Sequence, residues 1–347
     1  MAFSNDMTNG KMKTDKILLD HGSGGKMSHS LIADFLLPFF DNPILSQLHD
    51  GAVLDINGQR LAFSTDTFVV DPIFFPGGSI GDLAVNGTVN DLAMCGATPQ
   101  YLSLGLILEE GFPIKNLQRI LKDIGVTALK AGVMVVTGDT KVVPKGAVDK
   151  IFINTSGVGR IPKDVDISSH RALPGDKIII SGSIADHGMT ILTQREGLKF
   201  DSPIKSDTAP LNHMVARILE VCKDIHVLRD PTRGGVGTAL NEIASKSGVG
   251  IKIYEEKIPL KDETAGICEL LGFDPLYVAN EGKLLAFVDP VHAAKVLAAV
   301  QKDEFGQEAC IIGETVSDYH GKVIMQTRIG GTRIVDMLTG DQLPRIC

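Results

Sequence analysis

Hydrophobic and polar residues follow one another along the chain with two different periods, which together predict a mixture of strands and helices. Short runs rich in β-branched and aliphatic residues predict strands over 61–65, 102–108, 133–137, 151–156, 177–181, 250–254, 284–288 and 322–326. Apolar residues at helical spacing predict helices over 26–39, 80–95, 114–131, 210–221, 236–247 and 291–301. Several strands follow one another before a helix appears, so we predict an α+β fold, not a barrel or a doubly wound sheet.

The chain divides into two halves with a similar order of predicted elements. A polar stretch that contains Pro and Gly, residues 160–176, separates them and is the predicted domain boundary. We therefore predict one domain over 16–162, a second over 170–329 and a terminal tail over 330–347. Residues 1–15 are polar and lack the apolar segment of an export signal, and we predict that they are disordered.

The amino-acid composition indicates which kinds of partner the protein does not bind. The chain has 347 residues, of which 44% are hydrophobic and 22% charged, which is typical of a globular protein with two domains. Acidic residues outnumber basic ones by 42 to 34, and no Lys/Arg-rich run is present, so we expect no nucleic-acid partner. The longest apolar stretches are far shorter than the ~20 residues that a membrane span requires. These features predict a cytoplasmic protein without a membrane partner.

The five cysteines are widely spaced and form no CxxC pair, so neither a zinc site nor a disulfide framework is indicated. Cys95, Cys222, Cys268 and Cys310 lie among apolar residues and are predicted to be buried core cysteines. Cys347 is the last residue, so its thiol has nothing after it to pack and can reach into another site. Its tail is either an inert terminus or a chemical arm.

A glycine-rich loop precedes the first predicted helix. It consists of His21, Gly22, Ser23, Gly24, Gly25 and Lys26. Its glycines would let the backbone approach a phosphate, and the following helix N-terminus offers free N–H groups. The loop departs from both the P-loop and the dinucleotide fingerprint, so a flexible linker remains an alternative.

Aspartates at the ends of predicted elements are the stronger signal in the first half. They are Asp50, Asp66, Asp91 and Asp139. Carboxylate oxygens are the ligands that Mg²⁺ prefers, and the phosphates of a nucleotide would complete its coordination shell. Each aspartate alone could instead cap a helix or a turn. In the second half, residues 230–235 and 280–282 are charged, glycine-containing turns, and a turn alone explains each of them.

Taken in order, these motifs resemble the superfamily that contains aminoimidazole ribonucleotide synthetase, selenophosphate synthetase and thiamine-monophosphate kinase, and within it the HypE family of hydrogenase maturation proteins. The matching segments are residues 21–25, 64–66, 75–78, 89–91, 138–141, 230–235, 280–282 and the terminal Pro344-Arg345-Ile346-Cys347. They span nearly the whole chain. The aspartate motifs are shared across the superfamily, whereas a tail that ends in cysteine is specific to the HypE family.

The resemblance implies a two-domain fold whose N-terminal domain dimerises through its strands and binds ATP, with the C-terminal domain closing over it. It implies a homodimer and an ATP-dependent dehydration of a carbamoyl group, carried on Cys347, to a thiocyanate. The cyanide is then passed to the iron of a [NiFe] hydrogenase. The implied donor is a HypF-like carbamoyltransferase, and the implied acceptor is a HypC–HypD-like complex.

The chemistry suggests roles for the motifs, because dehydration requires Mg²⁺, a base for nitrogen and a cation near the developing oxyanion. By hypothesis Mg²⁺ is bound by Asp50, Asp66, Asp91 and Asp139. The glycine loop, Asp66, Asn90, Asp91 and Asp139 contact ATP. Glu281 is the base, Lys141 the cation and Cys347 the covalent carrier, while His187 is a weaker candidate for a role. Lys141 and Glu281 come from different halves, so domain closure would assemble the site.

The tail is predicted to be a swinging arm. Paired glycines at 330 and 331 provide a hinge, and Pro344 would keep the tip extended. Because the arm must reach inward for dehydration and outward for the partner proteins, we predict two tail states.

Two alternative functions remain open from the sequence. One is a small-molecule kinase or synthetase of the same superfamily, such as a selenophosphate synthetase, although that reaction would be expected to use a cysteine near the glycine loop and none precedes Cys95. The other is a nucleotide-binding scaffold that presents its tail to partner proteins.

Overall fold

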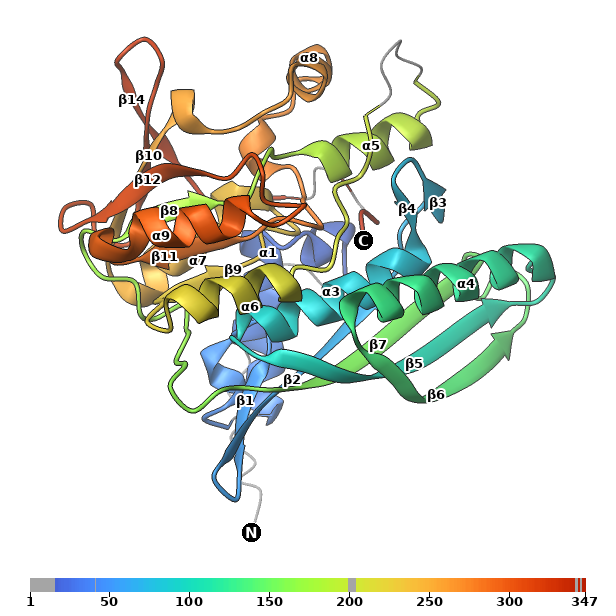
Figure 1. The fold of residues 1–347 in the computed structure, drawn as a ribbon. Helices are drawn as coiled ribbons and strands as arrows, with labels where there is room; N and C mark the ends of the chain where they lie inside the picture. Colours follow the sequence, from blue (N-terminus) through green and yellow to red (C-terminus); the bar gives the residue numbers. More distant parts are fainter. Residues whose placement is uncertain (1–15, 41, 199–203, 341–342, 344) are drawn as a thin grey trace.

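Two β-sheets, one in each half of the chain, carry helices on their faces (Figure 1). The computed structural model describes residues 16–40, 42–198, 204–340, 343 and 345–347. The segment 1–15, predicted to be disordered, and Pro344, predicted to extend the tip, lie outside the described residues.

The N-terminal sheet has five strands in the order β1-β2-β7-β5-β6. They are β1 (Ala52–Ile56), β2 (Gln59–Phe68), β5 (Thr98–Glu109), β6 (Met134–Val143) and β7 (Ile151–Arg160). Only β5 and β6 pair in parallel, and β6 is an edge strand. Helices α3 (Ile80–Met94) and α4 (Ile114–Ala131) lie over one face, and the hairpin of β3 (Phe74–Phe75) and β4 (Gly78–Ser79) leads into α3. This half is the predicted mixture of strands and helices.

The opposite face of this sheet is open. Buried and half-buried residues alternate along β7, because successive side chains of a strand point to opposite faces. On the open face, the strand register aligns an apolar row across four strands, formed by Phe63, Val158, Tyr101 and Met134. Three of these four are exposed, Phe63 by 44%, Tyr101 by 42% and Met134 by 60%. An exposed apolar row of this kind on the uncovered face of an open sheet is typical of an interaction surface.

The C-terminal sheet has seven strands in the order β14-β13-β10-β12-β8-β11-β9. They are β8 (Lys177–Ile180), β9 (Val227–Arg229), β10 (Gly250–Tyr254), β11 (Leu285–Val288), β12 (Cys310–Val316), β13 (Val323–Gln326) and β14 (Thr332–Val335). Because β14 pairs with β13, residues 332–335 of the predicted tail belong to this sheet.

Helices cover both faces of the C-terminal sheet. They are α5 (Asp186–Arg195), α6 (Asn212–Val221), α7 (Gly235–Ser247), α8 (Asp262–Leu271) and α9 (Pro290–Gln301), with short 3₁₀ turns η4 (Glu255–Lys257) and η5 (Pro275–Tyr277). Ile178 and Ile180 of β8 pack with α7, whereas Ile179 packs with α6 and α9. A strand buried on both faces is typically an unbroken apolar run, as Ile178–Ile180 of β8 are.

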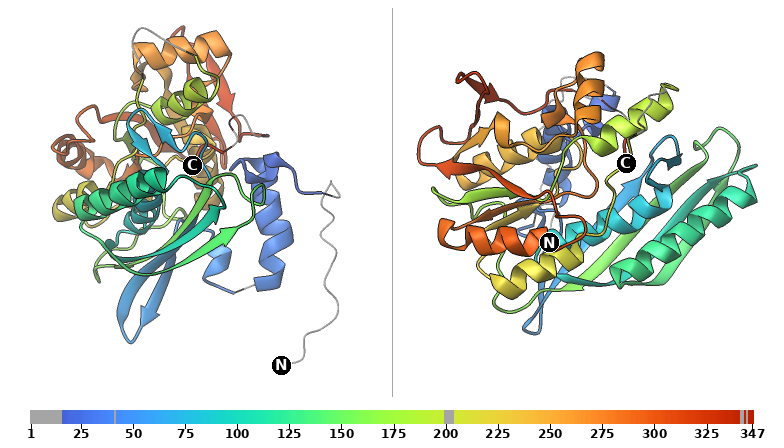
Figure 2. Two further views of the ribbon diagram at one scale, coloured as in Figure 1. Left: turned by 90° about the vertical axis from the view of Figure 1, so that its right-hand side faces the viewer. Right: turned by 45° about the horizontal axis from the view of Figure 1, so that its top comes forward.

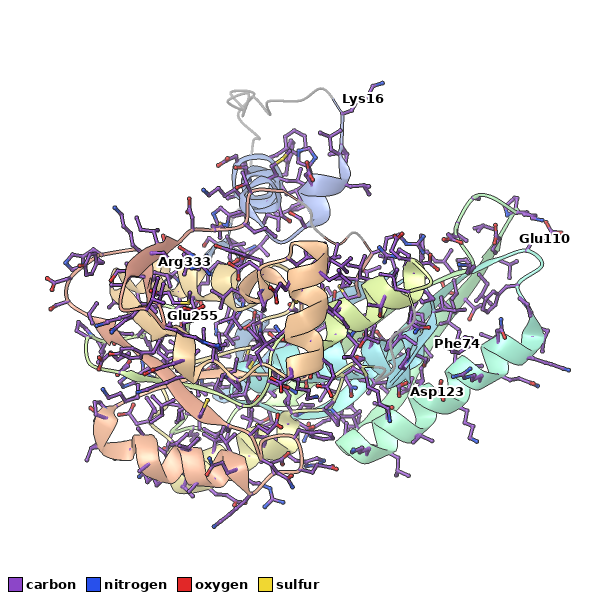
Figure 3. All side chains as sticks on the ribbon, turned by 90° about the horizontal axis from the view of Figure 1, so that it is seen from above. Lys16, Phe74, Glu110, Asp123, Glu255 and Arg333 are labelled. Atoms are coloured by element: carbon purple, nitrogen blue, oxygen red, sulfur yellow. The ribbon has the colours of Figure 1, made fainter. Side chains whose placement is uncertain are left out.

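An N-terminal arm stands beside this body. It comprises η1 (Leu19–Gly22), α1 (Lys26–Ser30), the π-helical η2 (Leu31–Leu36), α2 (Leu37–Phe40) and η3 (Leu45–Gln47). The predicted helix over 26–39 is thus one continuous helical run that contains a π-helical segment. Figures 2 and 3 show the arm clear of both sheets, with Lys16 at its outer end.

The two domains meet along α3. Asn90 lies on α3, and its amide donates to the carbonyl oxygens of Ala209 and Glu281 and accepts from the Leu211 N–H. Among the described residues, no helix is both long and apolar enough to cross a bilayer. Cys95, Cys222 and Cys268 are buried as predicted, whereas Cys310 is half-buried.

Candidate functional site

Three carboxylates from both domains converge at the domain interface. Asp50 precedes β1, Asp91 lies on α3 and Asp230 follows β9, and their oxygens lie within 4.8 Å of one another. Asp50 and Asp91 were predicted from the sequence as metal ligands, whereas Asp230 was interpreted as part of a turn. We call these three residues the carboxylate cluster.

A hydrogen bond holds one member of the cluster and an ion pair holds another. The Ser64 hydroxyl donates to Asp91 Oδ2 at 2.6 Å. Arg229 Nη1 lies 2.5 Å from Asp50 Oδ1, and its Nη2 lies 2.9 Å from Glu242 on α7. Asp50 Oδ2 is buried and has no hydrogen-bond partner among the described residues.

Burial places a strong electrostatic cost on the ionised cluster. It is the largest cause of the raised pKa of Asp91, which stands well above its usual value, and the nearby carboxylates raise it further. Burial and the Asp50 charge raise the pKa of Asp230 to about 7. Three crowded carboxylates with one unpartnered oxygen are the donor set that a hard divalent cation prefers, so the residues fit Mg²⁺.

Asp66 and Glu281 are two further acidic residues near the carboxylate cluster, and we call the five residues together the acidic site. Asp66 lies on β2, on the face covered by α3. Its Oδ2 is close to Gly87 of α3, because a Cβ added to Gly87 would lie 3.3 Å from this oxygen. Glu281 is buried, its N–H donates to Asp207 Oδ1 at 3.0 Å, and its Oε1 has no hydrogen-bond partner among the described residues. Burial, followed by the charges of Asp66 and Asp230, raises the pKa of Glu281 well above its usual value.

The C-terminal residue, Cys347, lines a pocket together with Arg233. The pocket is lined by residues that include Gly22, Ser23, Thr67, Arg233, Tyr277 and Cys347. The charge of Cys347 is the largest cause of the raised pKa of Arg233, followed, apart from the opposing effect of burial, by Asp66 and Glu281. Arg233 is therefore close enough to interact electrostatically with both the terminal residue and the acidic residues.

The glycine loop contributes Gly22 and Ser23 to the lining of the pocket. Arg233 Nη1 donates to the Gly22 carbonyl at 3.1 Å, and a Cβ on Gly24, whose φ is +79°, would lie 2.9 Å from Arg233. A Cβ on Gly25 would lie 2.3 Å from the Leu338 carbonyl oxygen. Glycine is required at these two positions because Arg233 and the chain after β14 approach the loop backbone.

The polar side chains of the loop make local contacts. His21 is buried and its Nδ1 accepts the Leu18 N–H, while the Ser23 hydroxyl donates to the Asp20 carbonyl. Lys26 Nζ pairs with Asp336 at 3.0 Å. What the loop offers the pocket is therefore mainly backbone.

The structure places Asp139 and Lys141 away from this pocket. Both lie exposed on β6, where their side chains pair at 2.6 Å. The strand register aligns Asp139 with Gly105, Asn154 and Thr67 in turn, so the side chains of Asp139 and Thr67 lie on the same, open face. Three strand spacings separate the two residues, a distance of roughly 14 Å. Asp66, one residue earlier on β2, points to the opposite face. Within one chain these residues and the acidic site are on different sides of the sheet.

Sequence reasoning gave no role to several residues that the structure brings to the site, namely Arg229, Asp230, Arg233 and Asp207. Asp230 and Arg233 belong to the 230–235 motif, so a signal was present but was interpreted as a turn. Asp207 carried no local signal, because its place beside Glu281 comes from folding alone.

The raised pKa of Asp230 predicts a pH dependence of stability. Its folded-state pKa of about 7 exceeds an ordinary aspartate value of about 4, so the folded protein binds more protons between these values. In EDTA, the free energy of unfolding should therefore fall as pH rises through this window and then stay low. Urea unfolding of wild type and Asp230→Asn measures this, because the variant lacks the titrating group. Parallel curves for the two proteins would contradict the assignment, and saturating Mg²⁺ should reduce the wild-type loss.

Comparisons with known proteins identify the family of both domains. Residues 48–161 match the family model described as AIR synthase related protein, N-terminal domain, and residues 174–326 match its C-terminal domain. Carbamoyl dehydratase HypE from Rhizobium leguminosarum bv. viciae is 50% identical over 343 residues, which cover 99% of this chain and 97% of that protein.

Two solved structures are similar along nearly the whole chain. A crystal structure of hydrogenase maturation protein HypE in complex with ATP has 52% identity and a TM-score of 0.81, covering 96% of this chain and 100% of that one. A HypE–HypF complex structure has 47% identity and a TM-score of 0.85, covering 89% and 100%.

Proposed function

The chain belongs to the HypE family of carbamoyl dehydratases, and from this premise we propose that it dehydrates a carbamoyl group on its own Cys347 to a thiocyanate at the expense of ATP. It is an enzyme of hydrogenase maturation. The observation that carries the residue-level proposal is that Cys347 lines one pocket with Arg233, whose guanidinium interacts electrostatically with Cys347 and with Asp66 and Glu281 of the acidic site. Intact-protein mass spectrometry tests it, since a carbamoylated chain should lose the mass of one water when Mg-ATP is added.

The reaction balances in two steps. The carbamoyl oxygen attacks the γ-phosphorus, ADP leaves, and one N–H proton is released as a C=N bond forms. The C–O bond then breaks, the second proton passes to the departing phosphate, and the thiocyanate remains on sulfur. The products are the thiocyanate, ADP, phosphate and one proton. Phosphorylation is needed because an unmodified carbamoyl oxygen is a poor leaving group.

The acidic site supplies a metal site and a base for these steps. Asp50, Asp91 and Asp230 would hold Mg²⁺, which neutralises phosphate charge when bound. Glu281 is proposed as the base for N–H, because its raised pKa makes its carboxylate a stronger proton acceptor. Arg233 adds a cation beside the terminal cysteine, where charge develops on oxygen. Gly22 and Ser23 line the same pocket, and the loop backbone is proposed to approach ATP.

A homodimer would supply Lys141 to the site of the other copy. This proposal is supported by the open sheet face, on which Lys141 and the apolar row both lie. When two such faces pack together, the row is removed from water. Lys141 and Asp139 then face the second copy and not the acidic site of their own chain.

Mixed dimers test the Lys141 proposal. Lys141→Ala and Cys347→Ala chains should each be inactive alone, but co-expressed chains should recover about a quarter of wild-type turnover, since half of statistically mixed dimers would hold one complete site. Single-turnover thiocyanate formation, quantified by mass spectrometry, measures the recovery.

The control variants for the mixed dimers act on dimer formation. Adding Tyr101→Glu to both chains places a charge in the centre of the apolar row, so it should remove the recovery and yield monomers in sedimentation velocity. Leu129→Glu adds the same charge at an exposed leucine on α4, on the helix-covered side, and should change neither. No recovery in mixed dimers, with dimerisation intact, would place Lys141 in its own chain's site or outside catalysis.

The partners follow from the proposed chemistry. A HypF-like carbamoyltransferase would load Cys347, and a HypC–HypD-like complex would accept the cyanide. The HypE–HypF complex of a relative supports the first of these. Cys95, Cys222, Cys268 and Cys310 are thiols outside any disulfide among the described residues, which suits a reducing cytoplasm.

A further inference from the structure

His187 connects the tail tip to the C-terminal domain. It lies in the first turn of α5, is fully buried, and its two ring nitrogens contact the Ser206 hydroxyl at 2.7 Å and the Ile346 carbonyl at 2.8 Å. The Ile346 carbonyl can only accept, so His187 Nε2 must carry the hydrogen and Nδ1 must accept from Ser206. Ser206 Oγ also accepts the Thr208 N–H, which leaves its own hydrogen for His187.

Further contacts of the tip come from both domains, and they include the ion pair of Arg345 with Asp149 at 2.5 Å. The Val69 N–H donates to an oxygen of the Cys347 terminal carboxylate at 2.9 Å, and the Asp71 N–H donates to the Arg345 carbonyl at 3.3 Å. Arg195 of α5 also donates to the Arg345 carbonyl, at 2.9 Å. The last three residues therefore lie between the end of β2 and α5, with Cys347 directed to the pocket that Arg233 lines.

Among the tip contacts described above, the hydrogen bond from His187 Nε2 to the Ile346 carbonyl is the buried one. Ile346 is only 4% exposed, so its carbonyl would have no water to replace a lost donor. Burial lowers the pKa of His187, and the neutral ring has the single N–H that this arrangement uses. Phe75 packs edge-on against the ring, with the two ring centres 5.6 Å apart, and restricts its rotation.

We propose that His187 is the positioning residue that holds Cys347 in its docked place for dehydration, and that its bond to Ile346 must break before the cysteine can reach a donor protein. This inference rests on the proposed function. According to this proposal, the hydrogen bond between His187 and Ile346 sets the equilibrium between the docked and the undocked tail, both of which the reaction requires.

The two half-reactions should respond to loss of this bond in opposite directions. His187→Leu keeps an apolar side chain of similar bulk but removes the donor, so the ratio of docked to undocked tail should fall roughly ten-fold. Alkylation of Cys347 by iodoacetamide, mapped by peptide mass spectrometry without nucleotide, should accelerate. Single-turnover dehydration of purified carbamoylated protein after Mg-ATP addition should slow, and the two factors should multiply to roughly ten.

Matched variants separate this role from a loss of structure. His187→Gln keeps an N–H near the Nε2 position and should restore both rates toward wild type. His213→Leu removes an exposed histidine whose Nε2 contacts the Lys130 carbonyl at 2.9 Å, and should change neither rate. Half-buried Cys310 is the internal reference, because its alkylation rate should stay constant in every variant.

The outcomes divide cleanly. Faster alkylation with slower dehydration in His187→Leu, and recovery in His187→Gln, supports the proposal. Unchanged alkylation overturns it, whether or not dehydration is lost, because His187 then does not hold the tail. If carbamoylated wild type fails to dehydrate, the proposed function fails, and the alkylation measurement still decides whether His187 holds the tip.

Discussion

Replacing Cys347 with alanine should abolish thiocyanate formation completely, while ATP binding stays close to that of wild type. The reason is covalent, because the carbamoyl carbon is bonded to this sulfur in every step of the proposed reaction. The other four cysteines lie elsewhere, and three of them are buried. The measurement is intact-protein mass spectrometry after incubation with a HypF-like donor, carbamoyl phosphate and Mg-ATP, with the modification mapped to the C-terminal peptide.

Cys310→Ala is the matched control for this variant, since it removes the other thiol that is not fully buried. It should gain the carbamoyl mass and then lose one water as wild type does. The same pair of variants separates the alternative functions. A small-molecule kinase would be indifferent to Cys347→Ala, and a scaffold would still bind its partners. Turnover of a carbamoyl group by Cys347→Ala would contradict the carrier role.

Most of the fold could be predicted, because long elements with one buried face show a clear period. Helix α4 has that pattern, and its observed bounds coincide with the predicted 114–131. Helix α5 was missed because residues 186–191 are buried on every side, which removes the amphipathic period. Strand β6 was predicted to end at 137, yet it continues to Val143, since an open face tolerates the polar residues 138–141.

The candidate site was only partly predictable, because convergence depends on facts that lie outside any local pattern. Asp50 and Asp91 were recognised from their positions at element ends. Asp230 completes the cluster from the second domain, and nothing in a turn motif gives its distance from Asp91. Asp139 resembles the other aspartates in sequence, but the face of the sheet that it occupies is set by strand register.

Replacing Asp91 with asparagine should affect metal binding and stability in opposite directions. The loss of one carboxylate from the cluster should weaken Mg²⁺-dependent ATP binding on the order of a hundred-fold and reduce dehydration at least as much. The same change removes a buried charge that Asp50 and Asp230 repel. The metal-free variant should therefore be more stable than wild type at pH 8. Titration calorimetry with Mg-ATP and urea unfolding in EDTA measure the two effects.

Asp82→Asn provides the control, because it makes the same change on the same helix at a residue that caps it. Asp82 accepts the Ser79 N–H at 2.9 Å and the Thr127 hydroxyl at 2.6 Å, so its loss should lower stability and leave Mg²⁺ affinity unchanged. A ligand of the metal and a capping residue therefore give opposite signatures. Equal Mg²⁺ affinity in wild type and Asp91→Asn would show that the cluster holds no metal. Reduced stability of metal-free Asp91→Asn would show that its bond to Ser64 outweighs the repulsion among the three carboxylates.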